Sequence, residues 1–131
     1  MKEKLIWKKE YEIGVYEIDS EHQIFLKIIQ KIDKAFQEKY EKEYTLLLLN
    51  ELYKYADFHF ISEENIMRFN KYPELNSHQE EHKKLLAKLS EKIGFFDIEF
   101  LNQKKLVKFL FEWFLGHTTT LDLKFGVFLK K

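Results

Sequence analysis

One helical stripe that contains a histidine runs through residues 18–36, which read IDSEHQIFLKIIQKIDKAF. Its core positions follow one another in alternating steps of four and three residues: Ile18, His22, Phe25, Ile29, Ile32 and Phe36. Residues at this spacing share one face of an α-helix, and such a face packs against other helices. A histidine on that face needs a partner, because an unpaired polar group costs about 1–3 kcal/mol to bury.

Three more stripes of this kind follow along the chain. Turn-like stretches separate them near Tyr40, at residues 70–73 and at residues 94–97. The stripes predict further helices over roughly residues 43–69, from Leu75 onward, and from near Phe100 to about Asp122. Ser20, with Gln23 three residues later, is a candidate cap for the first helix. We therefore expect an all-α fold, an antiparallel up-down-up-down four-helix bundle with an aromatic-rich N-terminal arm of 17 residues and a short C-terminal segment.

Composition narrows the classes of protein that this chain can belong to. Its 131 residues suit a single domain, residues 1–131, with one core. Lysine plus arginine and aspartate plus glutamate both number 22, so no basic excess indicates a nucleic-acid partner. There is no apolar run long enough for membrane insertion and no signal core at the N-terminus, and we expect a cytoplasmic protein. Because the chain has no cysteine, nitrogen and oxygen must hold any metal.

All five histidines belong to one spaced set with two acids. The set is His22, His59, Glu63, His78, His82, His117 and Asp122. The first six of these occupy positions that neighbouring leucines and isoleucines mark as core-facing, and the i, i+4 pairs share a helix face. A single histidine in such a place is most often a hydrogen-bonded core residue, but seven ligand-type side chains together predict a metal centre. This many nitrogen donors with few carboxylates suits a non-haem di-iron centre.

Four segments, in order, resemble bacterial hemerythrins. Gly14, Val15, Glu17, Ile18 and Asp19 lead into His22 as in the opening of that family. The other three strings are His59-Phe60-Ile61-Ser62-Glu63-Glu64, His78-Gln79-Glu80-Glu81-His82, and Trp113 through His117 to Asp122. The resemblance implies two iron ions joined by an oxo or hydroxo bridge. It also implies that His22 and His59 bind one iron, that His78, His82 and His117 bind the other, and that Glu63 and Asp122 bridge them.

With those ligands, two six-coordinate irons retain one open position, on the iron with two histidines. An open position beside ferrous iron in an apolar shell is a site for a small ligand, and O2 is the obvious candidate. Di-iron oxidases in helical bundles use Glu-x-x-His pairs, and no such string occurs here. We therefore expect reversible O2 binding for carriage, storage or delivery, and not an enzyme. The alternatives are an O2 or iron sensor, a redox enzyme acting on peroxide or nitric oxide, and a site in which the same ligands hold zinc or manganese. The sequence identifies no protein partner.

The O2 pocket is expected to be lined by bulky aromatic rings and by one polar residue, Thr118. Phe25, Phe60, Trp113 and Phe114 lie one turn from, or beside, the histidines. Thr118 departs from the family pattern, because the residue after this histidine is usually an apolar isoleucine there. Its hydroxyl either bonds a backbone carbonyl or faces the pocket, where it could admit water or donate a proton and speed autoxidation.

Two further expectations concern local geometry. His117 and Asp122 are five residues apart, which in a regular helix turns the second side chain away from the first. A π-type or loosened turn is expected there, eased by Gly116. Glu64, Glu80 and Glu81 are expected on the outer sides of their helices, and Tyr72 matches a family position but could equally be ordinary packing.

Overall fold

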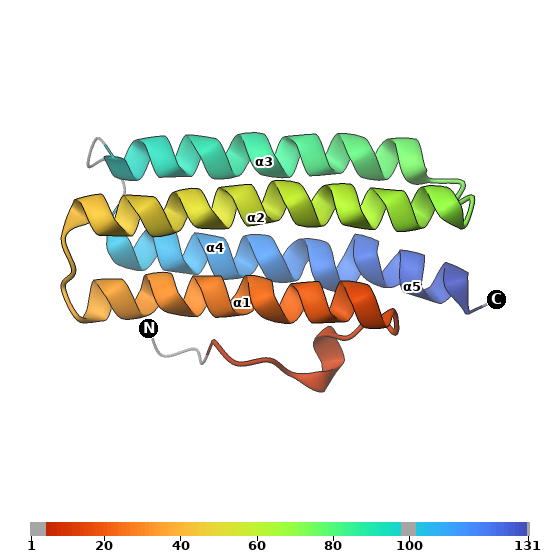
Figure 1. Ribbon diagram of the computed structural model, residues 1–131, viewed down its shortest axis with the longest axis horizontal. Coiled ribbons are helices and arrows are strands. Elements are labelled where there is room, and N and C mark those ends of the chain that lie inside the picture. Colours follow the sequence, from red (N-terminus) through yellow and green to blue (C-terminus); the bar gives the residue numbers. More distant parts are fainter. Residues whose placement is uncertain (1–4, 98–101, 131) are drawn as a thin grey trace.

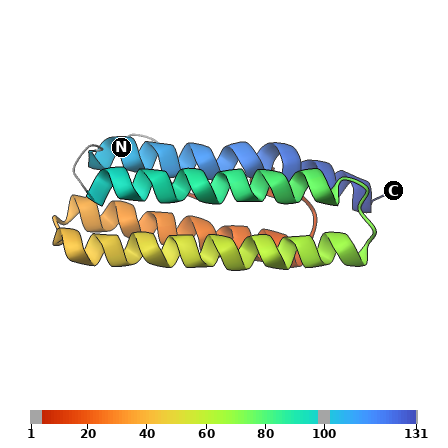
Figure 2. The ribbon, with the colours of Figure 1, turned by 90° about the horizontal axis from the view of Figure 1, so that it is seen from above.

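The computed structural model describes residues 5–97 and 102–130. Four long helices, α1 (Tyr16–Gln37), α2 (Lys42–Phe69), α3 (Leu75–Asp97) and α4 (Gln103–His117), run alternately up and down. Helix α1 packs against α2 and α4, and α3 packs against the same two neighbours (Figures 1 and 2). The described residues contain no strand, so the predicted all-α four-helix bundle is confirmed. No helix in the described part of the chain is long and apolar enough to cross a membrane.

The N-terminal arm lies along the bundle, as predicted. It contains a short turn, η1 (Lys9–Tyr11), and it buries Leu5, Tyr11 and Ile13. Figure 1 shows the arm running beside α1. The arm ends sooner than the predicted 17 residues because α1 already begins at Tyr16.

The predicted cap of the first helix is wrong. Ser20 lies inside α1, and Val15 at the cap position makes no side-chain cap bond. Instead the carboxylate of Asp19 accepts hydrogen bonds from the backbone N–H groups of Ile13, at 2.8 Å, and Gly14, at 3.1 Å. The charged carboxylate, which lies in the first turn of α1, thus provides acceptors for the backbone N–H groups just before the helix. The helix therefore begins before Ser20 and does not need that residue as a cap.

The predicted turn at residues 94–97 is also wrong. Helix α3 continues through the expected turn at residues 94–97. The low helix propensity of Gly94 reduces the stability of the helix only modestly, and Phe96 packs on Phe36 with ring centres 5.5 Å apart. The predicted start of the fourth helix at Phe100 lies outside the described residues; α4 begins at Gln103, with the Asn102 side chain accepting from the N–H of Lys105.

The fourth helix also does not end near Asp122. A turn, η2 (Thr118–Asp122), leads directly into α5 (Leu123–Leu129), which buries Phe125. Helix α5 meets the arm at Gly126, where a Cβ atom would overlap the carbonyl oxygen of Ile13. The predicted C-terminal segment is therefore a helix in backbone contact with the arm.

The apolar core has two parts. The larger cluster fills the body of the bundle with buried side chains from all four long helices, among them Leu26, Leu52, Leu89 and Leu110. The smaller cluster closes the end where α1 begins and α2 ends, and it consists of Ile13, Ile18, Met67, Tyr72 and Phe125. Tyr72 is therefore a packing residue at this end. Polar ligand-type side chains occupy the layer between the two clusters.

Candidate metal centre

The seven predicted ligand residues come together in the bundle interior. They extend from α1 (His22), α2 (His59 and Glu63), α3 (His78 and His82), the last residue of α4 (His117) and the end of η2 (Asp122). Their relative exposures run from 0% to 8%, so water does not solvate them. Their donor atoms form two groups: Glu63, His78, His82, His117 and Asp122, and His22, His59, Glu63 and Asp122.

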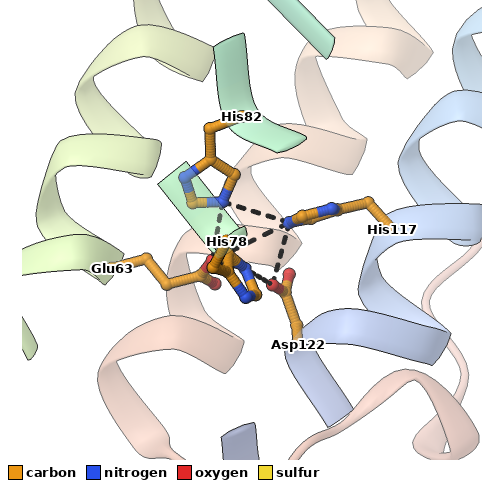
Figure 3. A group of neighbouring side chains, drawn as sticks. All are labelled: Glu63, His78, His82, His117 and Asp122. Carbon is orange, nitrogen blue, oxygen red and sulfur yellow. Dashed lines mark hydrogen bonds and ion pairs between the residues drawn. The ribbon is translucent and has the colours of Figure 1, made fainter. Parts of the chain in front are cut away.

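The first group has three imidazoles facing two carboxylate oxygens (Figure 3). Nε2 of His78 lies 3.0 Å from Oε1 of Glu63 and 3.1 Å from Oδ1 of Asp122. Nε2 of His82 is 3.0 Å from the same Glu63 oxygen, and Nε2 of His117 is 2.9 Å from the same Asp122 oxygen. The Nε2 atoms of His82 and His117 are only 3.1 Å apart. Once these two nitrogens have no proton, their lone pairs at this distance suit a shared cation.

The second group uses the other oxygen of each carboxylate. Nε2 of His22 lies 3.0 Å from Oδ2 of Asp122, and Nε2 of His59 lies 3.7 Å from Oε2 of Glu63. Glu63 and Asp122 therefore each direct one oxygen toward the three-histidine group and one toward the two-histidine group. This is the arrangement that a pair of carboxylates needs in order to bridge two cations.

Unsatisfied atoms show that the residues fit metal ions. Six buried atoms of the ligand residues make no hydrogen bond within the described chain. Two are the outer Nδ1 atoms of His22 and His117, and the other four belong to the second group: Nε2 of His22, Nε2 of His59, Oε2 of Glu63 and Oδ2 of Asp122. Leaving them so would cost about 1–3 kcal/mol each. Cations that accept both nitrogen and oxygen donors would satisfy all four at once.

In the metal-free protein the two carboxylates raise the pKa values of His78 and His117. Burial lowers the pKa of His78, but hydrogen bonds to Asp122 and Glu63 outweigh it and raise the pKa to about 9. Burial likewise lowers the pKa of His117, and the same two carboxylates raise it to about 10. For Glu63, burial and the Asp122 charge raise the pKa, yet hydrogen bonds from the histidines bring it down to about 2. The acids are therefore ionised near neutral pH and ready to bind a cation.

Two carboxylates outside the predicted set contact the outer nitrogen, Nδ1, of a ligand histidine. Oε1 of Glu21 lies 2.7 Å from Nδ1 of His59, and Oε2 of Glu64 lies 2.6 Å from Nδ1 of His82. A proton on each Nδ1 leaves the Nε2 lone pair pointing into the centre, an orientation typical of metal-binding histidines. The expected outward position of Glu64 is thus wrong, whereas Glu80 is exposed and pairs with Lys83.

Both of these carboxylates are fixed in place by other side chains. Ser62 donates to Glu21, at 2.8 Å, and Gln79 donates to Glu64, at 3.0 Å. The Tyr55 hydroxyl donates to the backbone carbonyl of Glu21, and burial together with the Glu21 charge raises the pKa of Tyr55. No spacing rule could have found these partners, because each joins two different helices.

Comparison with known proteins agrees with this geometry. The family model described as the Hemerythrin HHE cation binding domain matches residues 13–125. The chain belongs to the hemerythrin family. A relative named Bacteriohemerythrin, from Clostridium acetobutylicum, is 28% identical over 128 residues, which cover 92% of this chain and 97% of that protein. These matches confirm the family resemblance seen in the sequence. Hemerythrins bind O2 and are not enzymes, and membership of the family supports O2 binding and a metal-binding cluster.

The predicted π-type turn of this hemerythrin is confirmed. Residues Thr118–Asp122 form a single π-helical turn, η2, between α4 and α5. The wider turn brings Asp122 back to the side of His117, so that their side chains meet at 2.9 Å. The hydroxyls of Thr119 and Thr120 donate to the carbonyls of Leu115 and Gly116, which the wider turn leaves available.

A small cavity adjoins the two-histidine side of the hemerythrin centre. Its lining comprises His22, Phe25, His59, Phe60, Leu85, Trp113, Phe114, His117, Thr118 and Asp122. All five residues predicted for the O2 pocket are in this lining; Leu85 is an addition, and its carbonyl accepts from the Trp113 indole at 3.1 Å. The volume open to the centre of a water-sized molecule is about 10 Å³, which is the smallest space that holds one such molecule.

Proposed function

We propose that this hemerythrin binds O2 reversibly at a di-iron centre, for carriage, storage or delivery. Glu63 and Asp122 would bridge the two ions, His22 and His59 would hold one, and His78, His82 and His117 the other. The observation that carries the proposal is that both carboxylates direct one oxygen to each histidine group. When bound, two ferrous ions would supply the open coordination position and the electrons that reversible O2 binding requires.

The position of the cavity supports a ligand site at the two-histidine group. Both histidines of the second group, His22 and His59, line the cavity, whereas only His117 of the three in the first group does. A group with fewer protein donors has more room for an added ligand. We therefore assign the O2 site to the side of His22 and His59.

The cavity wall favours binding over turnover. Phe25, Phe60, Trp113 and Phe114 are all buried, and together they make the wall apolar. Such a wall excludes bulk water, which would otherwise deliver protons to reduced oxygen. The small volume also excludes any organic substrate of ordinary size. These side chains thus protect a small ligand and offer no general acid or base beyond the candidate ligands and Thr118.

Spectroscopy of the iron-loaded protein tests the proposal directly. The purified chain is loaded with iron, its metal is counted, and it is reduced without O2. Its visible absorption is then followed as O2 is admitted and withdrawn. Two irons per chain and a charge-transfer band that appears and disappears with O2 are expected. The variant His22→Leu is expected to lose this cycle. Continuous O2 consumption under reductant, or a band that never reverses, would overturn the proposal in favour of a redox enzyme.

A further inference from the structure

Thr118 is a buried residue, and its hydroxyl makes no hydrogen bond to another described residue. The residue is 2% exposed, and it lines the cavity beside the metal centre. Its two neighbours behave differently: the hydroxyl of Thr119 donates to Leu115 at 2.7 Å, and that of Thr120 donates to Gly116. The backbone N–H of Thr118 donates to the carbonyls of Phe114 and Leu115, and the Thr118 hydroxyl makes no hydrogen bond to the Phe114 carbonyl one turn before it. Of the two positions open to this hydroxyl, bonded to the backbone or facing the cavity, the structure favours the second.

The rest of the cavity lining has no comparable free polar group. Its other polar side chains are the candidate metal ligands His22, His59, His117 and Asp122, and the Trp113 indole already donates to Leu85. The cavity has room for one small molecule, so a ligand in it can provide the missing partner.

We propose that the Thr118 hydroxyl donates a hydrogen bond to the ligand in this cavity and selects diatomic molecules that gain negative charge when bound. The proposal rests on the proposed function, since it takes the cavity beside His22 and His59 as the ligand site. Hydrogen bonds to charged acceptors are stronger than those to neutral ones, so the preference follows the charge that the ligand acquires. Thr118 is thus a positioning and specificity-determining residue.

Nitric oxide is a suitable probe because it is diatomic, like O2, and its N–O stretching frequency responds to hydrogen bonding. The reduced, iron-loaded full chain receives one equivalent of nitric oxide without O2. Its infrared spectrum and its rate of nitric oxide release are then measured in the wild type and in Thr118→Val, Thr118→Ser and Thr119→Val. Valine keeps the shape of threonine and removes the hydroxyl, serine keeps the hydroxyl, and Thr119 is an exposed neighbour.

We expect Thr118→Val to raise the N–O frequency and to release nitric oxide roughly 3–10-fold faster, as the loss of one hydrogen bond predicts. We also expect the wild-type frequency to shift in heavy water and that of Thr118→Val to stay fixed. Thr118→Ser and Thr119→Val should behave as the wild type. An unchanged frequency and release rate in Thr118→Val would overturn the proposal, as would failure of the iron-loaded wild type to bind nitric oxide. If nitric oxide shows the expected pattern but O2 does not bind reversibly, the proposed function fails and the role of Thr118 stands.

Discussion

Removal of the Glu64 carboxylate should weaken one of the two metal sites selectively. Glu64 accepts from Nδ1 of His82 at 2.6 Å, and its side chain is 18% exposed, so solvent screens the pair only in part. Loss of such an outer carboxylate typically weakens metal binding by about 10–100-fold. We expect Glu64→Ala to lie in the upper part of this range. Glu64→Gln should lose roughly tenfold, because the amide oxygen can still accept the proton but carries no charge.

The corresponding change at Glu21 should affect the other metal. Glu21 lies behind His59, a member of the two-histidine group, and its side chain is 12% exposed. Glu21→Ala is therefore expected to loosen the iron beside the cavity, and Glu64→Ala the iron of the three-histidine group. The two variants should therefore lose different irons, which is the most specific prediction that the geometry makes.

Anaerobic competition with a ferrous chelator measures both effects. The reduced protein is equilibrated with increasing chelator, and iron per chain is counted at each step. Mössbauer spectra of the half-loaded samples then show which donor set remains. Glu80→Gln is the matched control, because that acid is exposed and, within the described chain, forms its ion pair with the exposed Lys83. Circular dichroism verifies that each variant is folded. The reasoning is refuted if Glu64→Ala retains both irons as tightly as the control, or if it loses the same iron as Glu21→Ala.

Three further predictions concern proton release, the pH dependence of stability and a backbone contact. Metal uptake near pH 7 should release protons from His78 and His117, because their pKa values without metal are about 9 and about 10. Calorimetry of metal binding in buffers of different ionisation enthalpy measures this release. Equal heats in all buffers would contradict the prediction. Because both values are raised, the stability that these rings give the metal-free protein is complete below about pH 6.5 and is lost as pH rises through 9 to 10, which urea unfolding at several pH values can check. Gly126→Ala should lower the unfolding free energy by about 1–3 kcal/mol, since its Cβ would overlap the Ile13 carbonyl. Gly94→Ala, which meets open space, should leave stability unchanged or raise it by up to about 1 kcal/mol, and similar urea midpoints for the two variants would show that the contact is not tight.

The bundle and the composition of the candidate site were predictable because both depend on helical periodicity. His22, His59 and Glu63 occupy steps that apolar neighbours mark as interior, and the structure buries all three. The distorted turn was also predictable. A regular helix would carry Asp122 away from His117, and only a wider turn brings the two together.

Features that depend on contacts between segments were not predictable. The Asp19 carboxylate binds N–H groups of the chain before α1, so the serine that follows it is not needed as a cap. Glu64 was expected on the outer side of its helix, yet α3 brings Nδ1 of His82 within reach of its carboxylate. Helical spacing determines which face a residue occupies, whereas these pairings depend on how neighbouring helices are shifted along one another.

The positions of Glu21, Glu64 and Thr118 suggest that metal retention and ligand selection are separable in this protein. The two carboxylates contact the outer nitrogens of ligand rings, away from the cavity, and each serves one histidine group. Thr118 lines the cavity and makes no hydrogen bond to a candidate ligand residue within the described chain. Changes at the carboxylates should therefore alter iron content first and ligand release only through the remaining iron. Changes at Thr118 should alter ligand release with both irons in place. A Thr118→Val protein that lost iron would show that the hydroxyl also supports the metal site, and the two functions would then not be separable.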